Sequence, residues 1–288
     1  MRDRTVLITG ATGGIGREAA RGLAAMGASL ALVGRDEERL ARAREQAVEA
    51  GSPEVRTFRA DISSMAEVRR LAGEVLEAIP RLDVLVNNAG TIVGERMTTA
   101  DGYEYTFALD HLSPFLLTNL LLPRLMASAP SRVVTVSSAA HWTGRMHFDD
   151  LMLERGYRPF RAYCQAKLAN VLFTYELARR QEGTGVTANC LHPGAVRTDF
   201  GKMLRGASRL GMSIIRPFEI GPRRGARTTI YLASSPDVQG VTGRYFVGRR
   251  LAASSPASHS SDDARKLWEA SERLTGLDLP DRPGKDYF

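Results

Sequence analysis

Near the start of the chain the sequence reads Thr5-Val6-Leu7-Ile8-Thr9-Gly10-Ala11-Thr12-Gly13-Gly14-Ile15-Gly16. Its first five residues are typical of a buried strand, and an amphipathic pattern from Arg17 to Met26 follows the glycines. Glycine permits a tight turn and lets backbone N–H groups approach a pyrophosphate, whose negative charge is favoured at a helix N-terminus. The stretch therefore predicts a strand, a turn able to bind a dinucleotide, and a helix.

The rest of the chain repeats this alternation of short apolar runs and longer helical patterns. Alternation of this kind predicts a parallel sheet with helices on both faces, a doubly wound α/β (Rossmann) fold. No break in composition divides residues 1–288, so we expect a single domain with a C-terminal extension over residues 254–288. The predicted strands are Val6–Thr9, Leu30–Val33, Val55–Phe58, Val84–Val86, Val133–Ser137, Val186–His192 and Arg244–Val247. The predicted helices are Arg17–Met26, Glu37–Ala50, Met65–Ala78, Tyr103–Ala127, Phe160–Gln181, Arg223–Ala233 and Asp262–Leu274.

With 43% hydrophobic and 25% charged residues, the 288-residue chain has the composition of an ordinary globular protein. Its two cysteines, Cys164 and Cys190, suggest neither a disulfide framework nor a metal site, and the five histidines are scattered. We therefore expect no metal. The sequence shows no signal-peptide pattern and no apolar stretch long enough to span a bilayer, so we expect a soluble, cytoplasmic protein.

The formal net charge of +7 raises the question of nucleic-acid binding. The arginines are spread along the chain instead of forming a tail or a basic helix, so we expect no nucleic-acid partner. Basic and apolar residues are interleaved most closely from Lys202 to Arg227. This pattern predicts a flap near residues 199–222 that touches an apolar substrate or makes a peripheral membrane contact. An ordinary surface helix and loop with solvated arginines is the alternative.

The end of the second predicted strand bears on the choice of coenzyme. In NAD-binding folds of this kind, an acidic residue at this place accepts hydrogen bonds from the ribose hydroxyls. Here the strand ends Val33-Gly34-Arg35, and a guanidinium can bind a 2′-phosphate through two hydrogen bonds. We therefore predict that NADP(H) is preferred over NAD(H), with Arg35 as the determinant. Asp36, one residue further along, keeps NAD open as the alternative.

Lys167 stands out because the chain otherwise uses arginine as its cation. Only Lys167, Lys202, Lys266 and Lys285 are lysines among the 39 lysine and arginine residues. Lys167 lies one helical turn after Tyr163, which places both side chains on one face of a helix. A compact ammonium can approach a phenol oxygen or a ribose where a planar guanidinium would be too wide. The pair is therefore a candidate for the centre of the chemistry.

Six ordered motifs make the chain resemble the short-chain dehydrogenase/reductase family along essentially its whole length. They are Thr9 to Gly16, Asp61-Ile62, Asn87-Asn88-Ala89-Gly90, Ser137-Ser138, Tyr163-x-x-x-Lys167 and Pro193-Gly194-x-Val196-x-Thr198. The finer pattern resembles the retinol dehydrogenase and protochlorophyllide-reductase-like branch. It is carried by Ala139-Ala140-His141, Ala162-Tyr163-Cys164, Lys167 to Phe173, His192-Pro193-Gly194 and Lys266-Leu267-Trp268.

The resemblance implies an enzyme that interconverts an alcohol and a carbonyl with a nicotinamide coenzyme. Tyr163 would exchange the proton with the reacting oxygen, Ser138 would hold that oxygen, and Lys167 would favour the ionised phenol and bind the nicotinamide ribose. Taken singly, Ser138 could instead cap a strand end; this reading weakens because all the motifs follow strands of one parallel sheet. The residues expected to bind the coenzyme are Gly10, Thr12, Gly14, Ile15, Gly16, Arg35, Asp61, Ile62, Asn88, Ala89, Gly90, Tyr163, Lys167, Pro193, Val196 and Thr198.

The chain departs from the family pattern at Asp110, within Leu109-Asp110-His111-Leu112. The family normally has an asparagine at this place, which is thought to hold a water that links the lysine to solvent. Aspartate is nearly isosteric but negative, so we expect it to keep the water and to raise the pKa of Lys167. The expected result is an active enzyme whose pH profile is changed, because Tyr163 is acidified to a different extent.

The resemblance also implies a lipophilic alcohol, aldehyde or ketone as substrate, and we expect the reducing direction. Retinoid-like chains, fatty aldehydes and polycyclic carbonyl compounds all stay open. A noncatalytic NADP-sensing regulator of the same fold is the alternative function, although such regulators typically lose the tyrosine or the lysine. Members of the family are usually homodimers or homotetramers, and the sequence does not distinguish between them.

Overall fold

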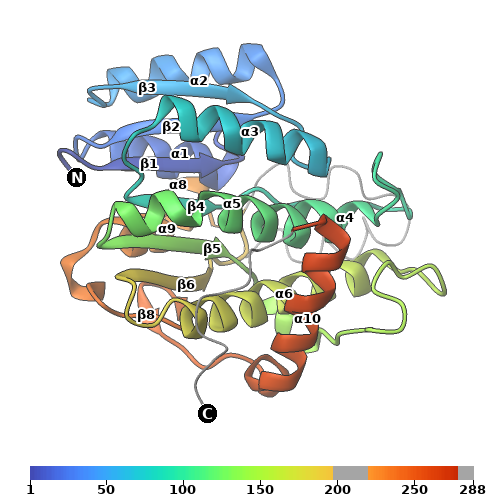
Figure 1. The fold of residues 1–288 in the computed structure, drawn as a ribbon. Coiled ribbons are helices and arrows are strands. Elements are labelled where there is room, and N and C mark those ends of the chain that lie inside the picture. The colour runs from blue at the N-terminus through green and yellow to red at the C-terminus, as the bar shows by residue number, and fades with distance from the viewer. Residues whose placement is uncertain (197–219, 278–288) are drawn as a thin grey trace.

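The computed structural model describes residues 1–196 and 220–277. Within these ranges eight strands form one sheet in the order β3-β2-β1-β4-β5-β6-β7-β8 (Figure 1). All neighbours from β3 to β7 are parallel, and only β8 runs antiparallel, against β7. The predicted fold is confirmed, and so are all seven predicted strands. The strands are β1 (Thr5–Thr9), β2 (Ser29–Gly34), β3 (Val55–Arg59), β4 (Val84–Asn87), β5 (Ser131–Val136), β6 (Val186–His192), β7 (Arg244–Val247) and β8 (Arg250–Leu251).

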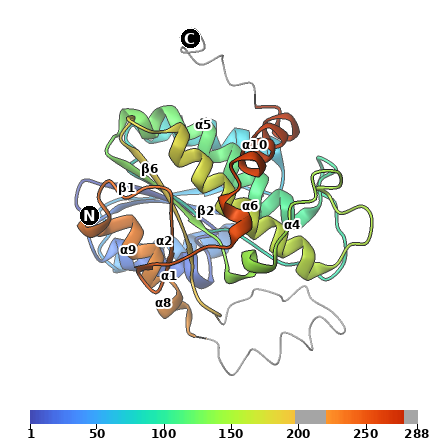
Figure 2. The same cartoon turned by 90° about the horizontal axis from the view of Figure 1, so that it is seen from below.

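Helices cover both faces of the sheet, as the view in Figure 2 shows. One face carries α1 (Gly14–Ala24), α2 (Glu37–Glu49), α8 (Pro222–Gly225) and α9 (Arg227–Ser234). The other carries α3 (Met65–Ala78), α5 (Ser113–Ala127), α6 (Pro159–Arg180) and α10 (Ser261–Thr275). None of the helices within the described ranges is both long and apolar enough to cross a bilayer.

The central strands are buried on both faces and contribute to two separate cores. Val6 and Ile8 of β1 join the core beneath α1, whereas Leu7, between them, joins the core beneath α3 and α5. Successive side chains of a strand point to opposite faces. A strand covered on both sides therefore needs an unbroken apolar run, which is what the first five residues of the glycine-rich stretch provide.

The predicted helix Tyr103–Ala127 is wrong as one continuous element. The structure has a short helix, α4 (Tyr105–Phe107), then a π-helical turn, η1 (Ala108–Leu112), and then α5. The cause lies in Pro114, in the first turn of α5, which has no N–H to donate to the carbonyl of Asp110 four residues earlier. The wider π-helical turn accommodates this missing hydrogen bond, and such turns occur often at functional sites.

The C-terminal helix α10 packs against α6 and α5 (Figures 1 and 2). Trp268 is buried, with its ring centroid 5.0 Å from that of Phe115 on α5 and 5.9 Å from that of Phe173 on α6. Arg69 on α3 donates hydrogen bonds to the carbonyls of Thr275 and Gly276, at 2.7 and 2.6 Å. The predicted C-terminal helix is therefore part of the main core.

Candidate active site

A cavity of about 700 Å³ opens at the carboxyl ends of the strands, beside the place where the strand order reverses at β1 and β4. Gly16 and Asp110 are not among its lining residues. Thr198, and the predicted flap up to residue 219, lie outside the described residues. The predicted site residues that line it are Gly10, Thr12, Gly14, Ile15, Arg35, Asp61, Ile62, Asn88, Ala89, Gly90, Ser138, Tyr163, Lys167, Pro193 and Val196.

The glycine turn after β1 is shaped to receive an anion. Gly13 is the N-cap residue of α1 and provides no side-chain hydrogen bond to the first N–H groups of the helix. Gly10 and Gly14 have φ angles of 65° and 52°, in the region that glycine alone adopts readily. Helix N–H groups that are not capped by a side chain can bind a phosphate. The turn therefore fits the pyrophosphate of a dinucleotide.

Gly16 contributes to this turn by close packing. A Cβ atom at Gly16 would lie 2.3 Å from the carbonyl oxygen of Gly10 and 2.5 Å from the side-chain nitrogen of Asn88. Asn88 in turn donates from that nitrogen to the carbonyl of Thr9, at 2.8 Å, and its backbone N–H donates to the Thr9 hydroxyl, at 3.0 Å. These contacts hold the ends of β1 and β4 together beneath the cavity.

The end of β2 brings two arginines to the cavity. Arg35 donates a hydrogen bond to the hydroxyl of Tyr105, at 3.3 Å, and both residues line the cavity together with Arg39. Asp36 is the N-cap residue of α2, and its carboxylate accepts a hydrogen bond from the backbone N–H of Arg39 at 2.9 Å. The sequence did not point to Arg39 or Tyr105, since neither belongs to a motif.

Ser138, Tyr163 and Lys167 meet on the opposite side of the cavity. Ser138 follows β5 and forms a side-chain hydrogen bond with Tyr163. Lys167 follows Tyr163 by one turn of α6, and its Nζ lies 5.4 Å from the centre of the phenol ring. The Ser138 hydroxyl also accepts a hydrogen bond from the backbone N–H of Ala140, at 3.2 Å. The structure thus brings together the three side chains that the sequence predicts as catalytic.

Asp110 makes a direct ion pair with Lys167. Their Oδ2 and Nζ atoms lie 2.8 Å apart, and the two side chains are only 0% and 4% exposed. The other carboxylate oxygen accepts a hydrogen bond from the backbone N–H of Thr91, at 2.7 Å. Gly90 leaves room for the pair, because a Cβ atom there would lie 3.0 Å from the Asp110 oxygen and 3.1 Å from the Lys167 nitrogen.

Burial and charge act against each other in this group. Burial alone would lower the pKa of Lys167, but attraction to Asp110 and to Tyr163 outweighs it and raises that pKa. Burial raises the pKa of Asp110, against the pull of Lys167 and the Thr91 N–H. Burial also raises the pKa of Tyr163; Lys167 opposes this increase and Asp110 adds to it. Asp110 therefore offsets part of the acidifying effect of Lys167 on the phenol.

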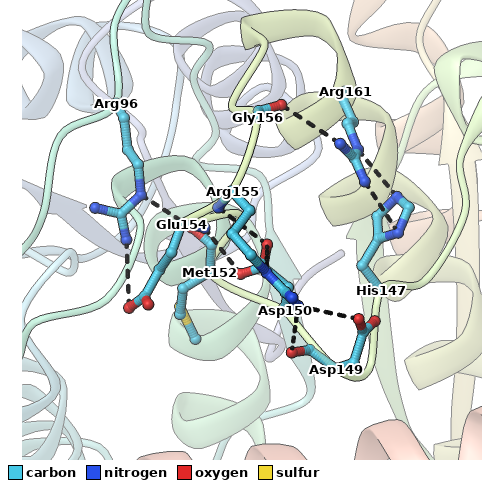
Figure 3. A network of polar contacts seen from close by, with 9 residues as sticks. All are labelled: Arg96, His147, Asp149, Asp150, Met152, Glu154, Arg155, Gly156 and Arg161. Atoms are coloured by element: carbon cyan, nitrogen blue, oxygen red, sulfur yellow. Dashed lines mark hydrogen bonds and ion pairs between the residues drawn. The ribbon is translucent and has the colours of Figure 1, made fainter.

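The loop over residues 144–158, which joins Ser138 to α6, is held by the polar network in Figure 3. Asp150 accepts hydrogen bonds from two backbone N–H groups of this loop, at 2.8 and 3.1 Å. Arg161 donates to the ring of His147 at 3.1 Å, and Arg96 donates to a carbonyl of the loop at 3.2 Å. The path of the loop is therefore held by hydrogen bonds within the loop and with Arg96 and Arg161.

Comparison with known proteins agrees with this geometry. The model of the short chain dehydrogenase family matches residues 4–208. The chain belongs to this family. This short-chain dehydrogenase is 45% identical to retinol dehydrogenase 14 of Homo sapiens, over 96% of the chain and 88% of the relative. It is 35% identical to a solved structure of an uncharacterized protein from Mycobacterium paratuberculosis, with a TM-score of 0.78 over 97% of this chain and 96% of the other.

A second solved structure is that of RhlG from Pseudomonas aeruginosa, described as an active-site complex with NADP. Its identity to the short-chain dehydrogenase is 29%, with a TM-score of 0.69 over 85% of this chain and 94% of the other. The family model and the retinol dehydrogenase relative place the protein in the retinol dehydrogenase-like branch, as an oxidoreductase that interconverts an alcohol and a carbonyl. Among residues 1–196 and 220–277 no three His, Cys, Asp or Glu side chains are grouped so that they could hold a metal ion.

Proposed function

We propose that this short-chain dehydrogenase reduces a lipophilic aldehyde or ketone with NADPH. The coenzyme preference is supported by the different positions of the acidic and the basic side chains at the end of β2. Asp36, the acid that could have bound the ribose hydroxyls of NAD, accepts a hydrogen bond from the helix it caps. Arg35 and Arg39 both line the cavity at the same place, where two guanidinium groups favour a 2′-phosphate.

The side chains around Tyr163 are suited to reduction of a carbonyl more than to oxidation of an alcohol. When it is bound, the nicotinamide supplies the hydride. The raised pKa of Tyr163, caused mainly by burial, keeps the phenol protonated at neutral pH, so that it can donate its proton to the carbonyl oxygen of the substrate. Ser138 holds the same oxygen through its hydroxyl. The ammonium of Lys167 stabilises the tyrosinate that is left until solvent returns the proton.

An apolar substrate is supported by the apolar residues that line the cavity. Ile92, Leu109, Ala140 and Phe160 are among them, and Phe160 is 60% exposed. A pocket with mostly apolar walls and a few convergent polar groups binds lipophilic small molecules. The relative named retinol dehydrogenase 14 agrees with a substrate of this class.

The test is a screen of apolar aldehydes, ketones and quinones that follows the oxidation of NADPH and, in parallel, of NADH. We expect turnover with NADPH that exceeds turnover with NADH, and we expect turnover about a thousandfold lower in the matched variant Tyr163→Phe. A wild-type protein that binds NADPH but reduces no compound would favour a coenzyme-sensing regulator instead. Equal kcat/KM values for the two coenzymes would overturn the assignment of NADPH.

A further inference from the structure

His141 joins the catalytic serine to the C-terminal part of the chain. It lies in the 3-10 helix that follows Ser138, η2 (Ala139–Thr143), and it is fully buried. Its Nδ1 lies 2.7 Å from the carbonyl oxygen of Ser138, and its Nε2 lies 3.0 Å from the backbone nitrogen of Ser255. One imidazole ring thus bridges two segments that are 114 residues apart in the sequence.

The partners of the ring determine where its proton lies. The Ser255 N–H can only donate, so Nε2 must be the unprotonated nitrogen that accepts this hydrogen bond. The Ser138 carbonyl can only accept, so Nδ1 must carry the proton. Both hydrogen bonds form only in the neutral ring with the proton on Nδ1, and burial lowers the pKa of His141, which favours the neutral form.

The segment on the far side of His141 is itself well anchored. Ser254 bonds through its hydroxyl to the hydroxyl of Tyr175 on α6, at 2.7 Å, and to the ring of His259, at 3.0 Å. The ring of Tyr245 on β7 lies 4.8 Å from that of His141, centre to centre. The segment around Ser254 therefore holds the His141 ring in place, and the ring can in turn hold the backbone at Ser138.

We propose that His141 is a positioning residue, which holds the backbone of Ser138 so that its hydroxyl points at the reacting oxygen. The proposal rests on the function proposed above, because it assumes that Ser138 contacts that oxygen. His141 itself is not among the residues that line the cavity, so we expect it to contact neither the substrate nor the coenzyme. We expect it to act on the reaction through the hydrogen bond to the carbonyl of Ser138.

Two conservative variants separate the two hydrogen bonds of the ring. In His141→Asn the amide NH₂ takes the place of Nδ1 and can still donate to the Ser138 carbonyl, but the acceptor for Ser255 is lost. In His141→Gln the amide oxygen takes the place of Nε2 and can still accept from Ser255, but the side-chain donor to the Ser138 carbonyl is lost, and only the backbone N–H of residue 141 still donates to it. Both variants lose the ring and its packing on Tyr245, so each controls for the other.

We expect kcat to fall about tenfold or more in His141→Gln and to stay within about twofold of wild type in His141→Asn, with the KM for NADPH unchanged in both. In a Ser138→Ala background the two variants should have the same kcat. Asn and Gln variants of His147, which bonds to Arg161 on the outer side of the molecule, should not differ from each other. Equal kcat values for the two His141 variants, or a difference that persists without the Ser138 hydroxyl, would overturn the proposal.

The wild-type protein provides a second test that needs neither a variant nor a substrate. ¹⁵N NMR of the imidazole should show His141 as the neutral tautomer with the proton on Nδ1, from about pH 6 to about pH 8. A proton on Nε2 would exclude the hydrogen bond to Ser138 and with it the proposal. If the wild-type enzyme reduced no compound, the proposed function would fail, while the tautomer would still report on the bridge.

Discussion

The two ends of the cavity are built differently. The end formed by β1 and β2 presents backbone N–H groups of the glycine turn and two arginines that line the cavity. The end formed by β5 and α6 presents side chains that interact with one another, and the buried Asp110 and Lys167 touch each other directly. The two arginines of the first end are exposed to water, whereas Asp110 and Lys167 of the second end form a buried, coupled pair.

Because of this difference, substitutions at the two ends should change different kinetic properties. An arginine in contact with water can be removed with little effect on its neighbours, and its loss is felt mainly by the phosphate that it binds. A change in the buried group alters the pKa of each remaining member, because their interactions are hardly screened. Substitutions at the β2 end should therefore change affinity, and substitutions at the α6 end should change rate and pH dependence.

The largest effect is expected for Tyr163→Phe, which removes the proton donor and keeps the ring. We expect kcat to fall about a thousandfold, within the range for loss of a general acid, while the dissociation constant for NADPH stays within about twofold of wild type. Stopped-flow reduction and fluorescence titration of NADPH would measure the two quantities. A large loss of coenzyme affinity would show that the two ends are not separable.

A smaller effect, on coenzyme affinity instead of rate, is expected for Arg35→Ala. Loss of a charge-assisted contact to the 2′-phosphate should raise the KM for NADPH about tenfold to a hundredfold and leave the KM for NADH nearly unchanged, with kcat preserved for both. Steady-state kinetics with the two coenzymes would show this. Equal increases for NADPH and NADH would contradict the role of Arg35, and the variant Arg39→Ala provides a comparison at the neighbouring guanidinium.

Gly90 lies where the two ends meet, since it lines the cavity and leaves room for the Asp110–Lys167 pair. The added methyl group of Gly90→Ala would press on both charged atoms, so we expect kcat to fall about fivefold and the KM for NADPH to rise by a similar factor. A thermal-unfolding scan should separate this effect from a general loss of stability. If the KM for NADPH rose and kcat stayed at the wild-type value, the prediction would be wrong. The Asp110–Lys167 pair would then be able to shift away from the new methyl group without slowing the reaction.

The most selective change is expected for Asp110→Asn. The pKa of Tyr163 is raised mainly by burial and further by Asp110, so removal of the negative charge should lower it. Reduction needs the protonated phenol, and the decline of kcat at alkaline pH should therefore begin at a lower pH than in wild type. Profiles of kcat against pH for the two proteins would measure the shift. Superimposable profiles would show that Asp110 does not control the titration.

Much of this organisation was predictable because parallel strands buried on both faces leave apolar runs in the sequence. Ser138 follows such a run directly, and Tyr163 and Lys167 have the spacing of one helical turn, so the structure was expected to bring them together. The direct contact between Asp110 and Lys167 was not predictable, since it depends on how closely η1 approaches α6. The break in the predicted helix had a visible cause in Pro114, whose missing N–H the hydrophobic pattern conceals.

Contacts between distant segments were the part that the sequence could not reveal. Tyr105 reaches Arg35 across 70 positions, and Ser255 reaches His141 across 114. No sequence pattern links the two partners of either pair, because a single hydrogen bond between distant segments leaves no periodicity in either of them. Arg39 was missed for a related reason: on a helix with many charged residues, no sequence pattern distinguishes the arginine that lines the cavity from the other arginines.

The docking of α10 on α6 has a consequence for the biosynthesis of the enzyme. Arg69 meets its partners Thr275 and Gly276 only after residues 275 and 276, about 200 positions later in the sequence, have been made and have left the ribosome. Until then the nascent chain displays the apolar surface of α5 and α6 that Trp268 later covers. We expect partly made chains to depend on chaperones at this stage and truncations within α10 to lower the cellular abundance of the enzyme.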